Sequence, residues 1–244
     1  MIRTENGCEV IEVKALSFGE ILWDIYPDER FIGGAPLNFA AHLARHGGDI
    51  SMLSAVGNDP WGAETLVAVR RLGIGGKYLA VSAGKQTGRC LVTLSEDGTP
   101  SYDLLQDVAY DYIRCDGLAE SFDLLYFGTL ALRSGYNLHT LERLLAENAF
   151  GEIFVDVNIR LPFCSAEVLS FCVENATVLK VSTEELPTVL ELLGMALEDD
   201  PPALMSALAQ RFPKLKLFCS PAVKTERGAM TAQNAKCIFP RLNR

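Results

Sequence analysis

The fold is decided by one stretch near the N-terminus, VKALSFGEILWDIYPDERFIGGAPLNFAAHLARHGGDISMLSAV, which spans residues 13–56. It contains two apolar runs, VKALSF (13–18) and ISMLSAV (50–56), that are typical of buried strands. The intervening segment GGAPLNFAAHLARHGG (33–48) has apolar residues at helical spacing, and Pro36 suits a first helical turn. A strand, a helix and a second strand in this order predict a parallel sheet covered by helices.

The same alternation continues along the rest of the chain. Further buried strands are expected at 123–128, 152–157, 177–182 and 215–220. Helices are expected at 36–46, 60–72, 136–149, 165–175, 184–194 and 202–212. One segment, GRCLVTLSEDGTPSYDLL (88–105), instead alternates apolar and polar residues around an Asp-Gly turn, which predicts a β-hairpin. Together with the extended segment 24–33, it is expected to form a small β lid over the carboxyl ends of the sheet, where open α/β folds bind ligands.

Composition and charge exclude several classes of protein. The net charge is −9, divided between −16 for residues 1–200 and +7 for residues 201–244, and an acidic body argues against nucleic acid as a partner. No apolar run reaches the length of a membrane span or a signal peptide. The seven cysteines include no Cys-x-x-Cys pair, which favours reduced thiols. The sequence therefore predicts a cytoplasmic α/β protein without a membrane partner.

A group of small and polar residues around the first expected helix could bind a polyol. Gly33 and Gly34 precede the free N–H groups of that helix, and Asn38 offers both a donor and an acceptor. A plain glycine turn before an ordinary helix explains the same pattern. Asp24 could accept hydrogen bonds from two neighbouring hydroxyls or be a solvated loop acid, and Arg89 could reach a sugar or phosphate or lie in solvent.

Three polar residues follow the strand expected at 152–157. Asp156, Asn158 and Arg160 occupy alternating positions, which predicts that all three lie on one face at the carboxyl end of the strand. They could form a polar cluster beside a phosphate or a purely structural hydrogen-bond network.

Longer matches carry a resemblance to a known family. The resemblance rests first on FGEILWDIYPDERFIGGAPLNFAAHLARHGGDISMLSAVGNDPWG (18–62), which is similar to the N-terminal signature of PfkB-type, ribokinase-like carbohydrate kinases, and closest to that of fructokinases. It continues in TGRCLVTLSEDGTPSYDLLQDVAYDYI (87–113), similar to the lid hairpin of the family, and in VDVNIRLPF (155–163), similar to its Asp-x-Asn-x-Arg segment. The resemblance implies a ribokinase-like α/β fold with a mostly parallel central sheet, helices on both faces and a small β lid. It also implies ATP-dependent phosphorylation of a primary hydroxyl of a small sugar, with Mg²⁺.

The resemblance also assigns domains and site residues. The main domain would comprise residues 1–23, 34–86 and 108–244, and the lid residues 24–33 and 87–107. The implied sugar-binding residues are Asp24, Gly33, Gly34, Asn38, Arg89, Asn158 and Arg160. The implied nucleotide-binding residues are Lys180, Ser182 and Gly228, and the implied metal residue is Glu185. Ser182 replaces the asparagine of the family's Asn-x-x-Glu element, and VKTERG (223–228) keeps only Gly228 of its Thr-x-Gly-x-x-Gly turn.

One element of the family is absent from the sequence. Its Gly-Ala-Gly-Asp segment supplies an anion hole and the aspartate that accepts the hydroxyl proton, and this chain contains no such segment. We therefore expect a C-terminally truncated or altered chain with no catalytic base of its own and with impaired catalysis. The alternatives are a sugar-binding or regulatory protein without catalysis, and a kinase for a related sugar acid or nucleoside. A homodimer formed through the lid is a further expectation.

Overall fold

The structure, a computed structural model, consists of two compact units. It describes residues 2–5, 8–11, 13–94, 100–118, 120–196, 207–221 and 235–238. Unit 1 comprises residues 1–127 and 134–151, and unit 2 comprises residues 128–133 and 152–244. Each unit is described by itself.

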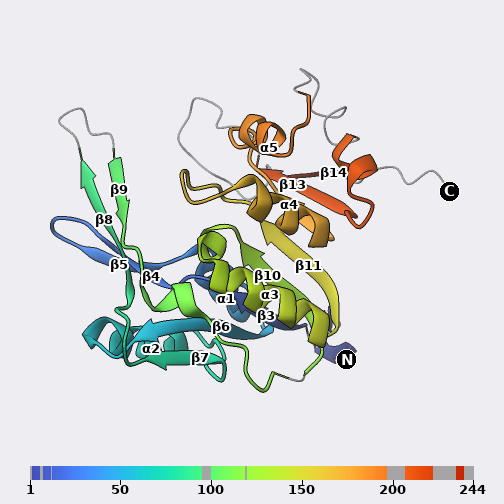
Figure 1. Ribbon diagram of the computed structural model, residues 1–244. Helices are drawn as coiled ribbons and strands as arrows, with labels where there is room; N and C mark the ends of the chain where they lie inside the picture. Colours follow the sequence, from blue (N-terminus) through green and yellow to red (C-terminus); the bar gives the residue numbers. More distant parts are fainter. Residues whose placement is uncertain are drawn as a thin grey trace, which may run out of the picture. The chain divides into compact units, whose positions relative to one another are not determined.

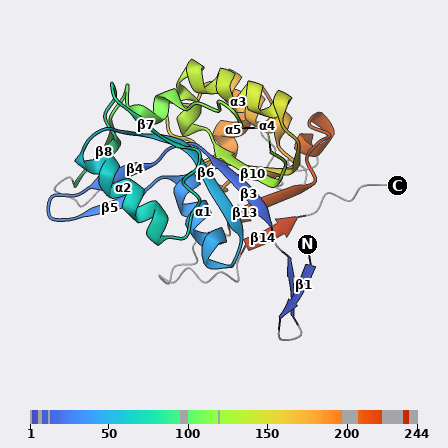
Figure 2. The same cartoon turned by 90° about the horizontal axis from the view of Figure 1, so that it is seen from below.

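A parallel sheet with helices on both sides forms the centre of unit 1. Its strands, in spatial order, are β10 (Phe122–Gly128), β3 (Lys14–Phe18), β6 (Asp49–Gly57) and β7 (Leu79–Ser82). Its helices are α1 (Ala35–Arg45), α2 (Pro60–Arg71) and α3 (Gly135–Glu147). Figure 2 shows α1 and α2 on one side of this sheet and α3 on the other. Apolar side chains between α1, α2 and the sheet, including Leu37, Met52 and Val69, are almost completely buried and form the core.

A second, four-stranded sheet belongs to the same unit and forms a separate layer (Figure 1). Its strands, in spatial order, are β5 (Arg30–Gly33), β4 (Leu22–Ile25), β8 (Gly88–Leu94) and β9 (Pro100–Leu104). Strands β8 and β9 are antiparallel, which confirms the predicted hairpin, and β4 pairs with β8 in parallel. The expected Asp-Gly turn of this hairpin lies outside the described residues.

Unit 2 contains a second set of strands with short helices. Strands β11 (Phe150–Asp156), β12 (Val178–Lys180) and β13 (Leu217–Pro221) are parallel, and β14 (Ala235–Ile238) pairs antiparallel with β13. Its helices are α4 (Ala166–Asn175) and α5 (Leu186–Leu192), with residues 207–211 also helical. A 3₁₀ turn, η2, spans Leu130–Arg133.

The mostly parallel α/β architecture agrees with the sequence. Each of the six expected strands is present, with ends within a few residues of the predicted ones. Four short strands were not predicted: β7, β14 and an N-terminal hairpin of β1 (Ile2–Glu5) and β2 (Cys8–Ile11). Strands of four residues carry too few side chains to show a periodic pattern, so only pairing identifies them.

Candidate functional site

The start of α1 is built around a buried carboxylate that sequence reasoning missed. Glu20 is 2% exposed, and its Oε1 accepts a hydrogen bond from the Ala35 N–H at 3.2 Å. Gly34 has a φ of 110°, and a Cβ there would lie 2.5 Å from the Glu20 carbonyl oxygen. The positive end of the helix dipole favours an anion at this place. Position 34 therefore requires glycine because of its close contact with Glu20, whether or not a ligand binds there.

Asp24 lies directly over the other glycine of the pair. A Cβ at Gly33 would lie 2.9 Å from Asp24 Oδ2, so the bare backbone leaves room for this carboxylate. The two residues lie on the paired strands β4 and β5. The preceding residue, Trp23, is 5% exposed and donates a hydrogen bond from Nε1 to Thr65 Oγ1 at 3.0 Å, which fixes β4 against α2. The structure therefore brings together Asp24, Gly33 and Gly34 of the predicted sugar residues.

Asn38 is exposed on the first turns of α1, one helical turn from Gly34. Its backbone N–H donates to the Gly34 carbonyl at 2.9 Å. It also borders a surface cavity of about 370 Å³ that is lined by Asn38, Ala41, His42, Arg45, Arg71 and Leu72. No other residue predicted to bind sugar lines this cavity. The Asn38 side chain is thus accessible to a small molecule.

Arg89 lies on the opposite face of the four-stranded sheet from Asp24. Its register partner on β4 is Trp23, whereas the partner of Asp24 is Cys90, and paired residues of neighbouring strands share a face. The Arg89 guanidinium carbon lies 5.9 Å from the centre of the Trp61 ring, and its buried Nε has no hydrogen-bond partner. Arg89 therefore does not share a face with Asp24, and its sugar-binding role stays a prediction.

The polar residues after β11 do not lie in the extended arrangement that the sequence predicts. Strand β11 ends at Asp156, and Asn158 has a φ of 37°, so the chain turns there and the expected alternation on one face is wrong. Asp156 is 7% exposed, and both of its carboxylate oxygens lie 2.7 Å from Lys180 Nζ. Arg160 is exposed and donates to the neighbouring Ile159 carbonyl at 3.0 Å. The nucleotide role of Lys180 and the sugar roles of Asn158 and Arg160 stay predictions.

Ser182 and Glu185 exchange two hydrogen bonds, in the pattern of a capping box, within the turn that leads into α5. The Glu185 N–H donates to Ser182 Oγ at 3.2 Å, and the Ser182 N–H donates to Glu185 Oε2 at 2.8 Å. The other oxygen, Oε1, accepts from the Ile159 N–H at 2.7 Å, so Glu185 also holds the turn that follows β11. The motif Ser-x-x-Glu is a known sequence signal for such a cap, and that signal could have found this arrangement.

The described residues do not by themselves fit a protein-held magnesium ion. Both oxygens of Glu185 already accept backbone N–H groups, whereas Mg²⁺ needs oxygen ligands in near-octahedral geometry. Within the described ranges, no group of three or more His, Cys, Asp and Glu side chains could hold a metal. The metal role of Glu185 stays a prediction, and no reaction step is assigned to a resident metal.

The expected nucleotide turn at 223–228, including Gly228, lies outside the described residues, as does the start, 202–206, of the helix expected at 202–212. In the part of the chain that is described, no helix has the length and apolar character needed to cross a membrane.

A second carboxylate that sequence reasoning missed begins α2. Asp59 is the N-cap of α2 and accepts from the Gly62 N–H at 2.8 Å, and it also accepts from the backbone and hydroxyl of Thr87. An aspartate followed by proline is a helix-start signal that could have identified the cap. The contact with Thr87 has no sequence signal, because the two residues are 28 positions apart.

Known proteins with similar sequences are sugar kinases by name. The model of the pfkB family of carbohydrate kinases matches residues 19–216. Fructokinase of Solanum tuberosum is 29% identical over 238 residues, which cover 87% of this chain and 69% of that protein. The Arabidopsis thaliana protein named "Probable fructokinase-4" is 29% identical over 223 residues, which cover 78% of this chain and 64% of that protein. The chain thus spans about two thirds of the length of these relatives.

Solved structures share the fold. A fructokinase of Vibrio cholerae in apo form superimposes with a TM-score of 0.74 at 21% identity, covering 94% of this chain and 78% of that one. The same enzyme in fructose, ADP and calcium ion bound form gives a TM-score of 0.71 at 19% identity, covering 94% and 74%. The ribokinase-like fold expected from the sequence is confirmed by these similarities. Since the family match extends over most of the chain, this protein belongs to the pfkB family of carbohydrate kinases.

Proposed function

We propose that unit 1 binds a small sugar, with fructose as the first candidate, and that the whole protein transfers a phosphoryl group from ATP to a primary hydroxyl of that sugar. The observation that carries this proposal is the Asp24 carboxylate, which lies over the bare backbone of Gly33. Membership of the pfkB family supports the reaction class. The names of the relatives and the fructose and ADP of the Vibrio cholerae enzyme support the choice of sugar and nucleotide.

The chemistry of these residues suits a polyol. An ionised carboxylate can accept hydrogen bonds from two neighbouring hydroxyls, and Asn38 can both donate and accept. Because Gly33 and Gly34 carry no side chains, a sugar ring can approach the backbone before α1. Trp23, on the other face of β4, is hydrogen-bonded to Thr65 of α2, and this contact fixes the strand that carries Asp24.

The residues proposed for nucleotide and metal binding lie in unit 2, and the family resemblance is what supports their roles. Lys180, Ser182 and Gly228 are proposed to bind the nucleotide and Glu185 the metal, whereas Asn158 and Arg160 are proposed sugar residues of the same unit. Mg²⁺ would arrive with ATP as part of the substrate. No Gly-Ala-Gly-Asp segment occurs in the 244 residues. Loss of a general base costs about 10²–10⁴ in rate, and loss of an anion-hole donor costs about 10²–10³.

The second candidate function is that of a sugar-binding or regulatory protein without catalysis. A chain with the sugar residues but without a catalytic base would bind sugar and not turn it over, as a sugar-binding or regulatory protein would. Sugar binding is common to both candidates, and ADP release separates them.

The first prediction concerns sugar binding by Asp24. Hydrogen bonds to a charged group are worth about 1.5–3 kcal/mol, so Asp24→Asn should weaken fructose binding about ten- to hundredfold in calorimetric titration. Asp28→Asn makes the same charge change in an exposed loop and should leave the affinity unchanged. Equal affinities of the wild-type and Asp24→Asn proteins would exclude Asp24 from the site.

Turnover is measured separately as ADP release with ATP, Mg²⁺ and fructose. The wild-type chain is compared with a chain extended by a Gly-Ala-Gly-Asp segment and its following helix from a family member. Activity only in the extended chain supports the kinase proposal and assigns the missing base. Sugar binding without ADP release in either chain supports the second candidate function.

A further inference from the structure

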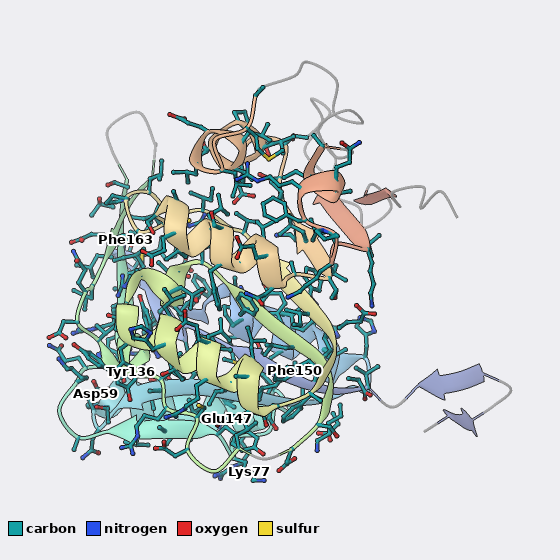
Figure 3. The ribbon with its side chains drawn as sticks, turned by 45° about the vertical axis from the view of Figure 1, so that its right-hand side comes forward. Asp59, Lys77, Tyr136, Glu147, Phe150 and Phe163 are labelled. Atoms are coloured by element: carbon teal, nitrogen blue, oxygen red, sulfur yellow. The ribbon has the colours of Figure 1, made fainter. Side chains whose placement is uncertain are left out.

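Thr87 lies where the chain enters the four-stranded sheet, and it is completely buried. It directly precedes β8, and its exposed fraction is 0%. The carboxylate of Asp59, from the start of α2, reaches it from the helical layer. Figure 3 labels Asp59 at this place. We propose that Asp59 and Thr87 form a latch that positions the four-stranded sheet, and with it Asp24, for sugar binding; this inference rests on the proposed sugar site.

Four hydrogen bonds make up the latch. Asp59 Oδ2 accepts from the Thr87 N–H at 2.8 Å, and Oδ1 accepts from the Thr87 hydroxyl at 2.7 Å and from the Gly62 N–H at 2.8 Å. The Thr87 hydroxyl in turn accepts from the Gly57 N–H, at the end of β6, at 2.9 Å. One carboxylate and one hydroxyl thus connect a helix, a strand of the parallel sheet and the first residue before β8.

Two glycines permit this close approach. A Cβ at Gly57 would lie 2.5 Å from the Thr87 nitrogen and 2.6 Å from Asp59 Oδ2. A Cβ at Gly62 would lie 2.0 Å from the Gly57 carbonyl oxygen and 3.0 Å from Thr87 Oγ1. Real side chains essentially never approach backbone atoms so closely, so both positions require glycine. The fit explains why the motif GNDPWG (57–62) begins and ends with this residue.

The electrostatics favour an ionised latch. Partial burial raises the pKa of Asp59, but the hydrogen bonds from the backbone and hydroxyl of Thr87 and from Gly62, with the nearby charge of Arg89, outweigh it and lower the pKa. The carboxylate is therefore ionised at neutral pH, and its hydrogen bonds are charge-assisted and stronger than neutral ones.

Thr87 can influence the position of Asp24 because β8, which follows Thr87, pairs with β4, which carries Asp24. Gly88 pairs with Leu22 and Cys90 pairs with Asp24, so β4 is held in register by its hydrogen bonds to β8. A Cβ at Gly88 would lie 2.4 Å from the buried Tyr110 ring, so this end of β8 is closely packed. A change in the position of Thr87 would be passed to β8, and from β8 to β4 through their pairing. Asp59 and Thr87 would act as positioning residues, without touching the sugar.

The test uses two variants that loosen the latch in different ways. Thr87→Val removes the hydroxyl and its two hydrogen bonds, and Asp59→Ser keeps a helix-capping side chain that is too short to reach Thr87. Thr140→Val is the matched control, because its buried hydroxyl lies 3.1 Å from the Ile113 carbonyl oxygen, outside the latch.

Two measurements are made on the 244-residue chain and on each variant. The first is hydrogen exchange of the β4 and β8 amides, which needs no sugar. The second is fructose affinity from the fluorescence of Trp23 and Trp61, the two tryptophans of the chain, whose rings lie 5.4 Å apart beside the latch.

Both latch variants should exchange faster in β4 and β8 and bind fructose at least about fivefold more weakly, the effect of losing one ordinary hydrogen bond. Thr140→Val should lower the melting temperature while leaving both readouts unchanged. Exchange and affinity in Thr87→Val equal to those of Thr140→Val would overturn the latch. Faster exchange with unchanged affinity would overturn its positioning role. If the wild-type chain binds no sugar, the proposed function fails, and the exchange data still decide whether the latch exists.

Discussion

Gly34 has two independent reasons to be glycine. Its φ of 110° lies in a region that L side chains rarely adopt, and its missing Cβ leaves room for the Glu20 carbonyl. At its neighbour Gly33, the missing Cβ instead leaves room for the Asp24 carboxylate. The glycine pair therefore serves the packing of two acidic residues at the start of α1, and the second of these faces the proposed sugar site.

Comparison of two glycines separates backbone strain from close packing. Gly47 has a φ of 85°, and a Cβ there would meet nothing within 4 Å, so Gly47→Ala should cost only the strain of about 1–2 kcal/mol. Gly34→Ala adds a contact of 2.5 Å with backbone and should cost clearly more in the free energy of unfolding. Urea unfolding followed by tryptophan fluorescence measures both. Equal losses in the free energy of unfolding would show that the backbone around Glu20 moves to accept the added Cβ without cost.

At the scale of elements, short polar side chains join pieces that are distant in sequence. Asn137, at the start of α3, is completely buried; its Oδ1 accepts from the Ile113 N–H at 2.8 Å, and its Nδ2 donates to the Tyr110 carbonyl at 2.7 Å. It thereby fastens the 3₁₀ turn η1 (Ala109–Tyr112), which follows the four-stranded sheet, to α3. Buried polar groups of this kind fix the geometry of an element because an unpaired partner is costly.

Truncation of Asn137 should therefore be strongly destabilising. Asn137→Ala leaves two buried backbone groups without this partner, at about 1–3 kcal/mol each, so the free energy of unfolding should fall by about 2–6 kcal/mol. Asn148→Ala, at the other end of α3, removes one partly buried hydrogen bond to Leu144 and should cost less. A smaller loss of stability in Asn137→Ala than in Asn148→Ala, measured by denaturant titration, would contradict the fastening role.

At the scale of the whole molecule, hydrogen bonds to one carboxylate join distant segments of unit 1. Glu120, before β10, accepts from Lys14 Nζ and from the Tyr78 hydroxyl, both at 2.6 Å, and also from Lys77. Three segments that are far apart in sequence therefore meet at one carboxylate. The expected homodimer through the lid stays a prediction at this scale.

This cluster predicts a pH dependence of stability. Hydrogen bonds from Lys14 and Lys77, and then from Tyr78, lower the pKa of Glu120 from 4.5 to about 2. Because the pKa is lower in the folded state, the stabilisation is complete above about pH 4.5 and is lost as the pH falls toward about 2. The difference in urea midpoint between wild type and Glu120→Gln should be largest near neutral pH, shrink in acid and shrink in about 1 M salt. A difference that grows in acid would contradict this assignment.

The sequence by itself determined the order of strands and helices, the hairpin at 88–105 and the family, because each depends on local periodicity or on contiguous motifs. It also singled out Asp24 and the glycine pair, which lie together in the structure, while their sugar-binding role stays a prediction. Only the tertiary structure decided that Arg89 lies on the face opposite Asp24, that Lys180 pairs with Asp156, and that Thr87 meets Asp59. These contacts join residues that are far apart in the chain, and strand register and backbone turns set them. No local pattern encodes such contacts. A shift of one residue in register, for example, would move the side chains of a whole strand to the other face.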